Sequence, residues 1–154
     1  FDDIFSQIVK SFKFIDQVTD RQTYVNSQYG FEFTYPTSWR MVKERPTASA
    51  EYLSGSRNYV VIYPDIYPAQ DFDARIDVYD VSLATVLRDN RFLKNKQSSL
   101  VKINNISWTK IQDVNYQGDL MDSFNYLVEK NGKIYHVGGR TDLSNQILST
   151  FKIY

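Results

Sequence analysis

The chain has 154 residues, a length that fits one domain with a sizeable core. Its 42% hydrophobic and 23% charged residues are typical of a globular protein and argue against disorder. Lys+Arg and Asp+Glu are both 18, so the zero net charge argues against a nucleic-acid partner. The absence of cysteine excludes disulfides, zinc–thiolate sites and thiol catalysis.

The first 22 residues read as an amphipathic helix followed by a linker. Within residues 1–15, apolar residues recur at helical spacing, for example at Ile4, Ile8 and Phe12. No signal peptide and no apolar run of membrane-spanning length is visible. Because the chain opens at Phe1, we expect any export signal, lipid anchor or membrane helix to lie upstream.

The rest of the chain reads mainly as strands joined by tight turns. Asn104-Asn105 and Asn131-Gly132 predict hairpin turns, Gly30 predicts a turn with positive φ, and 44–55 reads as a surface loop. The predicted strands are 24–26, 31–35, 59–63, 71–79, 99–103, 106–114, 120–129 and 133–137. Hairpin connections predict a mainly antiparallel sheet.

Two further helices are expected to cover that sheet, which makes the fold class α+β. Ser82 is the predicted N-cap of the first helix, and Thr141 or Asp142 that of the second. In the strand over 71–79, the alternation predicts that Ala74, Ile76 and their neighbours of like parity face the core. Asp71, Asp73, Arg75, Asp77 and Tyr79 are then expected to face solvent or a partner.

Residues 7–15 (QIVKSFKFI) echo residues 146–154 (QILSTFKIY) at a constant offset. One explanation is that two amphipathic helices share common residues. The other is a repeat boundary, in which residues 1–15 copy the closing helix of an upstream domain and 23–154 form a complete domain.

The start of that domain resembles a known family. Tyr24-Val25-Asn26, then 29–36 (YGFEFTYP) and Trp39, resemble the opening of PsbP-like domains, and residues 130–135 and 146–152 are similar to their late hairpin and end. The resemblance implies a PsbP-like α/β/α sandwich, with helices on both faces of a central antiparallel sheet, in an exported bacterial surface protein or lipoprotein. It implies no photosynthetic role and no particular functional residues.

Candidate sites are few. His136, the sole histidine, reads as a packing or surface residue. Four carboxylates could bind calcium, or could be solvated charges that protect the edge of a strand: Asp65, Asp71, Asp73 and Asp77. Gly138-Gly139-Arg140 reads either as an anion site or as a strand-to-helix turn. Binding candidates are Arg140 and the aromatic set Tyr52, Tyr59, Tyr63 and Tyr67, which core packing explains equally well.

We therefore expect a non-catalytic extracytoplasmic binding or assembly module without a cofactor, anchored through an upstream segment. Its expected partner surface comprises the loops over 37–56 and 64–71, and self-association through residues 1–15 is a second expected contact. The alternative is a structural spacer in a tandem-repeat surface protein, and an enzyme ranks last.

Overall fold

The computed structural model describes residues 20–39, 41–46, 56–63, 74–90, 93, 96–114 and 120–154. The helix predicted over 1–15 lies outside these residues, as does most of the predicted linker. The domain boundary after residue 22 stays a prediction. The elements are β1 (Arg21–Asn26), β2 (Phe31–Pro36), β3 (Met41–Pro46), β4 (Ser56–Tyr63), β5 (Ala74–Tyr79), α2 (Leu83–Asp89), β6 (Ser98–Ile103), β7 (Ile106–Val114), β8 (Leu120–Lys130), β9 (Lys133–Arg140), α3 (Thr141–Leu148) and β10 (Lys152–Ile153).

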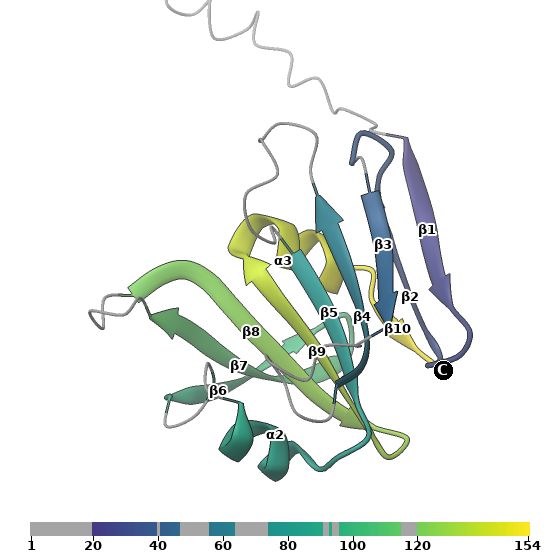
Figure 1. Cartoon of the computed structure of the whole chain (residues 1–154). Coiled ribbons are helices and arrows are strands. Elements are labelled where there is room, and N and C mark those ends of the chain that lie inside the picture. Colours follow the sequence, from purple (N-terminus) through teal and green to yellow (C-terminus); the bar gives the residue numbers. More distant parts are fainter. Residues whose placement is uncertain are drawn as a thin grey trace, which may run out of the picture.

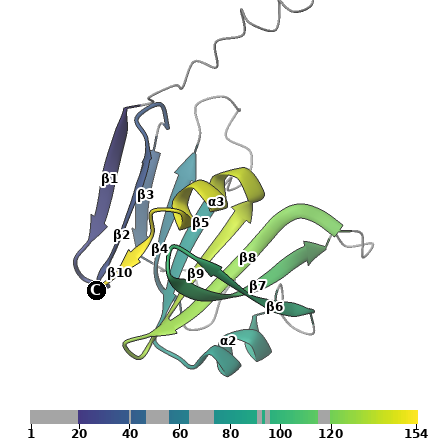
Figure 2. The same ribbon diagram turned by 180° about the vertical axis from the view of Figure 1, so that it is seen from behind.

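The strands form two antiparallel sheets (Figures 1 and 2). The larger has seven strands in the order β3-β4-β5-β9-β8-β7-β6, and the smaller has three in the order β1-β2-β10. The predicted α+β class with antiparallel pairing is confirmed, although the strands divide between two sheets. Among the described residues, no helix is long and apolar enough to cross a membrane.

Local signals placed several elements correctly. Ser82 caps α2 by accepting a hydrogen bond from the Thr85 backbone N–H at 3.2 Å. Gly30 has φ 70°, as its turn requires. Both residues of each predicted asparagine turn have positive φ, which is the geometry of a two-residue type I′ hairpin.

Three predictions are wrong. Residues 44–46 of the loop expected over 44–55 belong instead to β3, which pairs with β4 and which also interrupts the contact loop expected over 37–56. Gly138-Gly139-Arg140 is not the expected strand-to-helix turn, since all three residues belong to β9 and pair with its neighbour β8. The N-cap of α3 is Arg140, which makes no side-chain capping bond, and not Thr141 or Asp142.

The main core lies between the two sheets and α3 around Phe151. The Phe151 ring stacks on Phe31 at 5.4 Å between centroids and meets Trp108 edge-on at 5.6 Å. The main core also includes Ile147 and Leu148 of α3. The segment 146–154 is thus the end of α3 followed by β10.

A second apolar cluster lies on the other face of β9. Because successive side chains of a strand point to opposite faces, Tyr135 and Val137 belong to the main core while Ile134 belongs to this cluster. Val86 of α2 also packs in it. The α/β/α sandwich with helices on both faces stays a prediction. On one face of the seven-stranded sheet, the three-stranded sheet and α3 together cover the main core.

Candidate functional site

The most unusual feature of the described residues is a row of polar side chains on the α2-side face of the large sheet. In β5, Arg75, Asp77 and Tyr79 alternate along the strand and share this face. Asp77 pairs in register with His136 of β9, and Arg75 pairs with Gly138. The register therefore brings the sole histidine beside an aspartate.

Asp77 was expected to face solvent or a partner, and this expectation is wrong: its side chain is 0% exposed. An ionised carboxylate in such a place requires paired charge and hydrogen bonds. Arg75 supplies both, since its Nε and Nη2 donate to Asp77 Oδ1 at 2.8 and 2.5 Å. Tyr79 is also buried rather than outward-facing, because the second apolar cluster covers this end of the strand.

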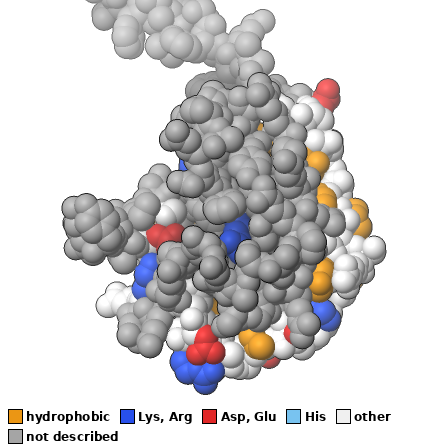
Figure 3. Space-filling view, in the orientation of Figure 1, with side chains coloured by type: hydrophobic (Ala, Val, Ile, Leu, Met, Phe, Trp, Pro, Cys, Tyr) orange, Lys and Arg blue, Asp and Glu red, His pale blue; other side chains and the backbone are white. Residues whose placement is uncertain are grey.

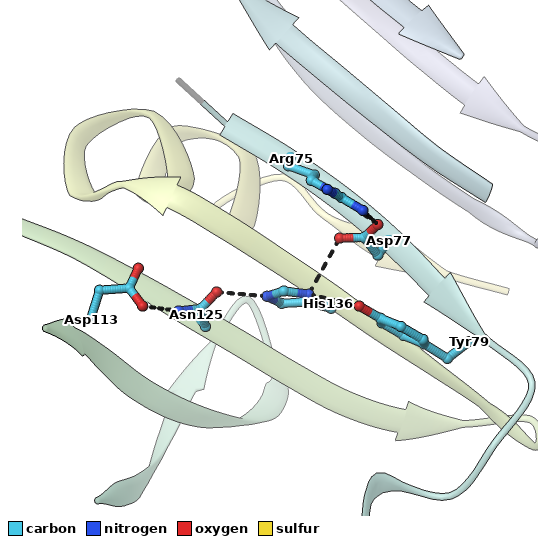
Figure 4. A network of polar contacts seen from close by, with 6 residues as sticks. All are labelled: Arg75, Asp77, Tyr79, Asp113, Asn125 and His136. Atoms are coloured by element: carbon cyan, nitrogen blue, oxygen red, sulfur yellow. Dashed lines mark hydrogen bonds and ion pairs between the residues drawn. The ribbon is translucent and has the colours of Figure 1, made fainter. Parts of the chain in front are cut away.

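His136 joins Asp77 to the next strand, as Figure 4 shows. Its Nδ1 lies 3.4 Å from Asp77 Oδ2, at the long end of hydrogen-bonding distance, and the pair is ionic only when the imidazole is protonated. Its Nε2 lies 2.8 Å from Asn125 Oδ1. The side chain is buried, so of the two expected roles, packing and surface, the structure selects packing.

The Asn125 amide determines which histidine nitrogen carries a proton. Asn125 Nδ2 donates to Asp113 Oδ1 at 2.7 Å, which leaves Asn125 Oδ1 as the acceptor for His136. His136 Nε2 must then be the donor. In the neutral imidazole Nδ1 is an acceptor that faces the Tyr79 hydroxyl at 3.5 Å, and in the imidazolium it donates toward Asp77.

We call Arg75, Asp77, His136, Asn125 and Asp113 the buried polar chain. It crosses four neighbouring strands, β5, β9, β8 and β7. At its far end, Asp113 accepts from Ser123 Oγ at 3.0 Å and pairs with Lys96 Nζ at 3.3 Å. Each end of the buried polar chain thus has an aspartate paired with a cation, and His136 lies between the two aspartates.

Gly138 provides the space that this arrangement needs. A Cβ at position 138 would lie 2.8 Å from Asn125 Oδ1 and 3.1 Å from His136 Nε2, the two atoms of the central hydrogen bond. Real Cβ atoms are not found that close to an oxygen. The glycine read from the sequence as part of a loop is therefore a strand residue that leaves room for the buried polar chain.

The polar groups of this arrangement interact mainly with one another. Each of its ionisable groups contacts another member of the chain or a neighbouring side chain, and His136 is 6% exposed. Within the described residues, no group of three or more histidines, aspartates or glutamates could hold a metal ion. The geometry suits a polar tie between strands better than a reaction site, which needs reactive atoms that a substrate can reach.

Of the residues considered in the sequence as site candidates, Asp77 and His136 belong to the buried polar chain. Arg140 is partly exposed at the end of β9, and its Nη2 donates to Asp142 Oδ2 at 3.0 Å. Tyr59 and Tyr63 lie on β4, where Tyr59 pairs in register with Asp77, but their side chains lie outside the described residues. Asp65, Asp71, Asp73, Tyr52 and Tyr67 lie outside the described residues, so the calcium hypothesis stays untested.

The sequence analysis missed Asn125 and Asp113. A signal for Asn125 exists, because it interrupts an otherwise apolar or aromatic run from Phe124 to Val128 in a predicted strand. A polar residue in such a place is normally hydrogen-bonded. Its partners, however, lie 11 or 12 positions away in the chain, and no local pattern identifies them.

Three solved structures are similar to this chain. Cyanobacterial PsbP (CyanoP) from Synechocystis sp. PCC 6803 matches with 13% identity over 89% of this chain and 94% of that chain, at a TM-score of 0.49. A crystal structure from Bacteroides thetaiotaomicron matches with 14% identity at a TM-score of 0.48; it covers 86% of this chain, which spans only 48% of that one. LpqN, involved in cell envelope biogenesis of Mycobacterium tuberculosis, matches with 15% identity over 87% of this chain and 91% of its own, at a TM-score of 0.40.

No family model and no curated protein matches the sequence. The opening motif resembles PsbP-like domains, and one of the structures similar to this chain is a cyanobacterial PsbP. At these identities and TM-scores the similarity carries over no site residue and no function.

Tyr79 allows a test of how closed this region is. Burial raises the pKa of its hydroxyl well above the ordinary value of 10, and the nearby Asp77 carboxylate raises it further. The folded state therefore keeps the Tyr79 proton at pH values where the unfolded chain loses it. We predict that the free energy of unfolding falls as pH rises above about 10, and that Tyr79→Phe makes the fall shallower.

The measurement is urea unfolding of both proteins between about pH 8 and pH 11. Tyr35, Tyr126 and Tyr135, whose pKa values burial also raises, contribute to the slope that remains in the variant. Identical alkaline slopes in the two proteins would show that the Tyr79 hydroxyl is open to water.

Proposed function

We propose that this chain is a non-catalytic binding or assembly module that works outside the cytoplasm. The non-catalytic part of the proposal rests on the pairing of the buried Asp77 and His136 and the partly exposed Asp113 with other side chains. These are acid–base groups of the kind that enzymes use. Each contacts protein partners across the sheet. This pairing supports a role in holding the strands together rather than in turning over a substrate.

The proposed location outside the cytoplasm rests on the resemblance of the opening motif to PsbP-like domains. The residues of that motif serve the fold: Phe31 and Phe33 are buried in the main core, and Trp39 stacks on Tyr35 at 6.2 Å. A structural motif of this kind carries a fold and its usual location, but it names no partner. We place the anchor in a segment upstream of residue 1, and we keep as the contact region the parts of 37–56 and 64–71 that lie outside β3, β4 and the buried Trp39.

A structural spacer in a tandem array is the second candidate. It is favoured by the echo between 7–15 and 146–154, because Ile147 and Phe151, two of the residues that recur, are fully buried in the main core. A repeated pair of core residues is what a second copy of the same domain would need. Under this candidate the module provides length and connection, and its upstream neighbour is a similar domain.

We expect His136 to be shielded from reagents in the folded protein. Diethyl pyrocarbonate acylates imidazoles that it can reach, and the chain has one histidine, so mass spectrometry of one peptide reports the rate. The native rate should be at least about 100-fold below the rate in urea, because only opened molecules react. Val25→His, at a position that is 54% exposed, provides a matched reactive imidazole.

If His136 reacts in the native protein as fast as the imidazole introduced at position 25, its nitrogens are accessible. The non-catalytic assignment is then wrong, and the enzyme alternative returns with Asp77 and His136 as its first candidates.

We also expect the domain to be exposed outside the cytoplasmic membrane. With the full-length protein produced in its own host, protease added to cells whose outer layers are permeabilised should digest the domain while a cytoplasmic marker stays intact. Protection of the domain until the inner membrane is lysed contradicts the proposed location, and it leaves the non-catalytic assignment unaffected.

A further inference from the structure

Strand β6 ends the seven-stranded sheet and exposes an apolar side chain. Leu100, in the middle of β6, is 79% exposed, more than the other exposed large apolar side chains of the described residues, Val25 and Tyr154. Ser98 and Ser99 beside it are also exposed. Exposed edge strands pair readily with other strands, and proteins usually protect them with charge, proline or bulges.

The hairpin geometry determines which backbone groups of β6 face outward. The turn at Asn104-Asn105 is type I′, with φ 49° and 62°, and a two-residue turn of this type makes Ile103 and Ile106 a hydrogen-bonded pair. Alternate residues of β6 then direct their N–H and C=O groups away from β7. Leu100 and Lys102 are among them, so Leu100 presents both its side chain and its backbone groups.

The other edges are less suited to pairing. Strand β3 carries three consecutive charged residues, Lys43, Glu44 and Arg45, followed by Pro46, and β10 has only two residues. On β1 the exposed Val25 is next to the last residue of the strand. Figure 3 shows that the apolar side chains at the right-hand margin of the molecule, where β1 lies in Figure 1, form separate patches with other side chains and backbone between them.

The sequence of β6 is complementary to itself. In an antiparallel pair centred on Leu100, Leu100 meets its own copy, and Lys102 lies opposite Ser98 at both ends. Lys102 is the only charged residue of the strand, so no like charges face each other. The ladder between β6 and β7 has no bulge, which leaves a regular edge for a partner.

We propose that two copies of this chain associate through β6, in an antiparallel pair with a two-fold axis at Leu100. The pair joins two seven-stranded sheets into one continuous sheet and covers an apolar side chain that is otherwise in water. One strand pair buries little surface, so the dimer is weak and its dissociation constant lies in the micromolar range or above. The inference goes beyond the proposed function and does not depend on it.

A disulfide cross-link tests the register directly. Residues in a hydrogen-bonded antiparallel pair have Cα atoms about 5.5 Å apart, a separation that a disulfide spans. The chain has no cysteine, so Leu100→Cys introduces a single thiol without background. Under mild oxidation at high concentration we expect Leu100→Cys to form a disulfide-linked dimer. Val25→Cys, the matched control on the β1 edge, should stay mostly monomeric.

Sedimentation velocity of the unmodified full chain over a wide concentration range provides the second measurement. We expect a concentration-dependent shift toward dimer, and we expect Leu100→Pro to abolish it. Proline removes only the outward N–H at this edge position, so the ladder to β7 and the melting temperature should persist. The same shift should remain when residues 1–15 are deleted.

Three results overturn the inference: a monomer at all concentrations, equal cross-linking at positions 25 and 100, or a dimer that survives Leu100→Pro. Loss of the dimer on deletion of residues 1–15 also overturns it and assigns self-association to that segment. None of these results bears on whether the module is catalytic or where it is located.

Discussion

A carboxylate with no exposure to water is the constraint on which the centre of this structure depends. An ionised group in such a place costs several kcal/mol unless charge and hydrogen bonds compensate it, and removing one member of a buried pair typically costs about 3–5 kcal/mol. Arg75 donates twice to Asp77, and His136 faces its other oxygen. From His136 the hydrogen bonds continue through Asn125 to Asp113, so side chains from four strands surround the buried carboxylate in one connected row.

This solution explains several features that otherwise look unrelated. Glycine at position 138 leaves space for this row, because a Cβ there would lie 2.8 Å from Asn125 Oδ1 and would displace the hydrogen bond between His136 and Asn125. The only histidine is turned inward, and its Nε2 holds a proton for a structural reason. The groups most suited to catalysis therefore act within the sheet. We propose that recognition uses the surface and the strand edges, where β6 offers an exposed leucine and outward backbone groups.

Local physics made much of the fold predictable. The positive-φ turns at Asn104-Asn105 and Asn131-Gly132, the Ser82 cap and the strand over 106–114 depend on neighbours in sequence, and the structure confirms them. The alternation in β5 correctly predicted which side chains face the main core, but it wrongly placed Asp77 and Tyr79 in solvent. Alternation in one strand does not show that a second apolar cluster covers the opposite face of the sheet. Strand β3 was missed because its polar residues resemble a loop, and the buried polar chain was missed because its partners are distant in sequence.

A double-mutant cycle on His136 and Asn125 tests the central claim most directly. Free energies of unfolding from urea titration of the wild type, His136→Leu, Asn125→Leu and the double variant give the coupling between the two side chains. If the hydrogen bond between them ties β9 to β8, each single change leaves a buried partner unsatisfied, and the double variant loses about 1–2 kcal/mol less than the sum of the two. Losses that add within about 0.3 kcal/mol would contradict the account.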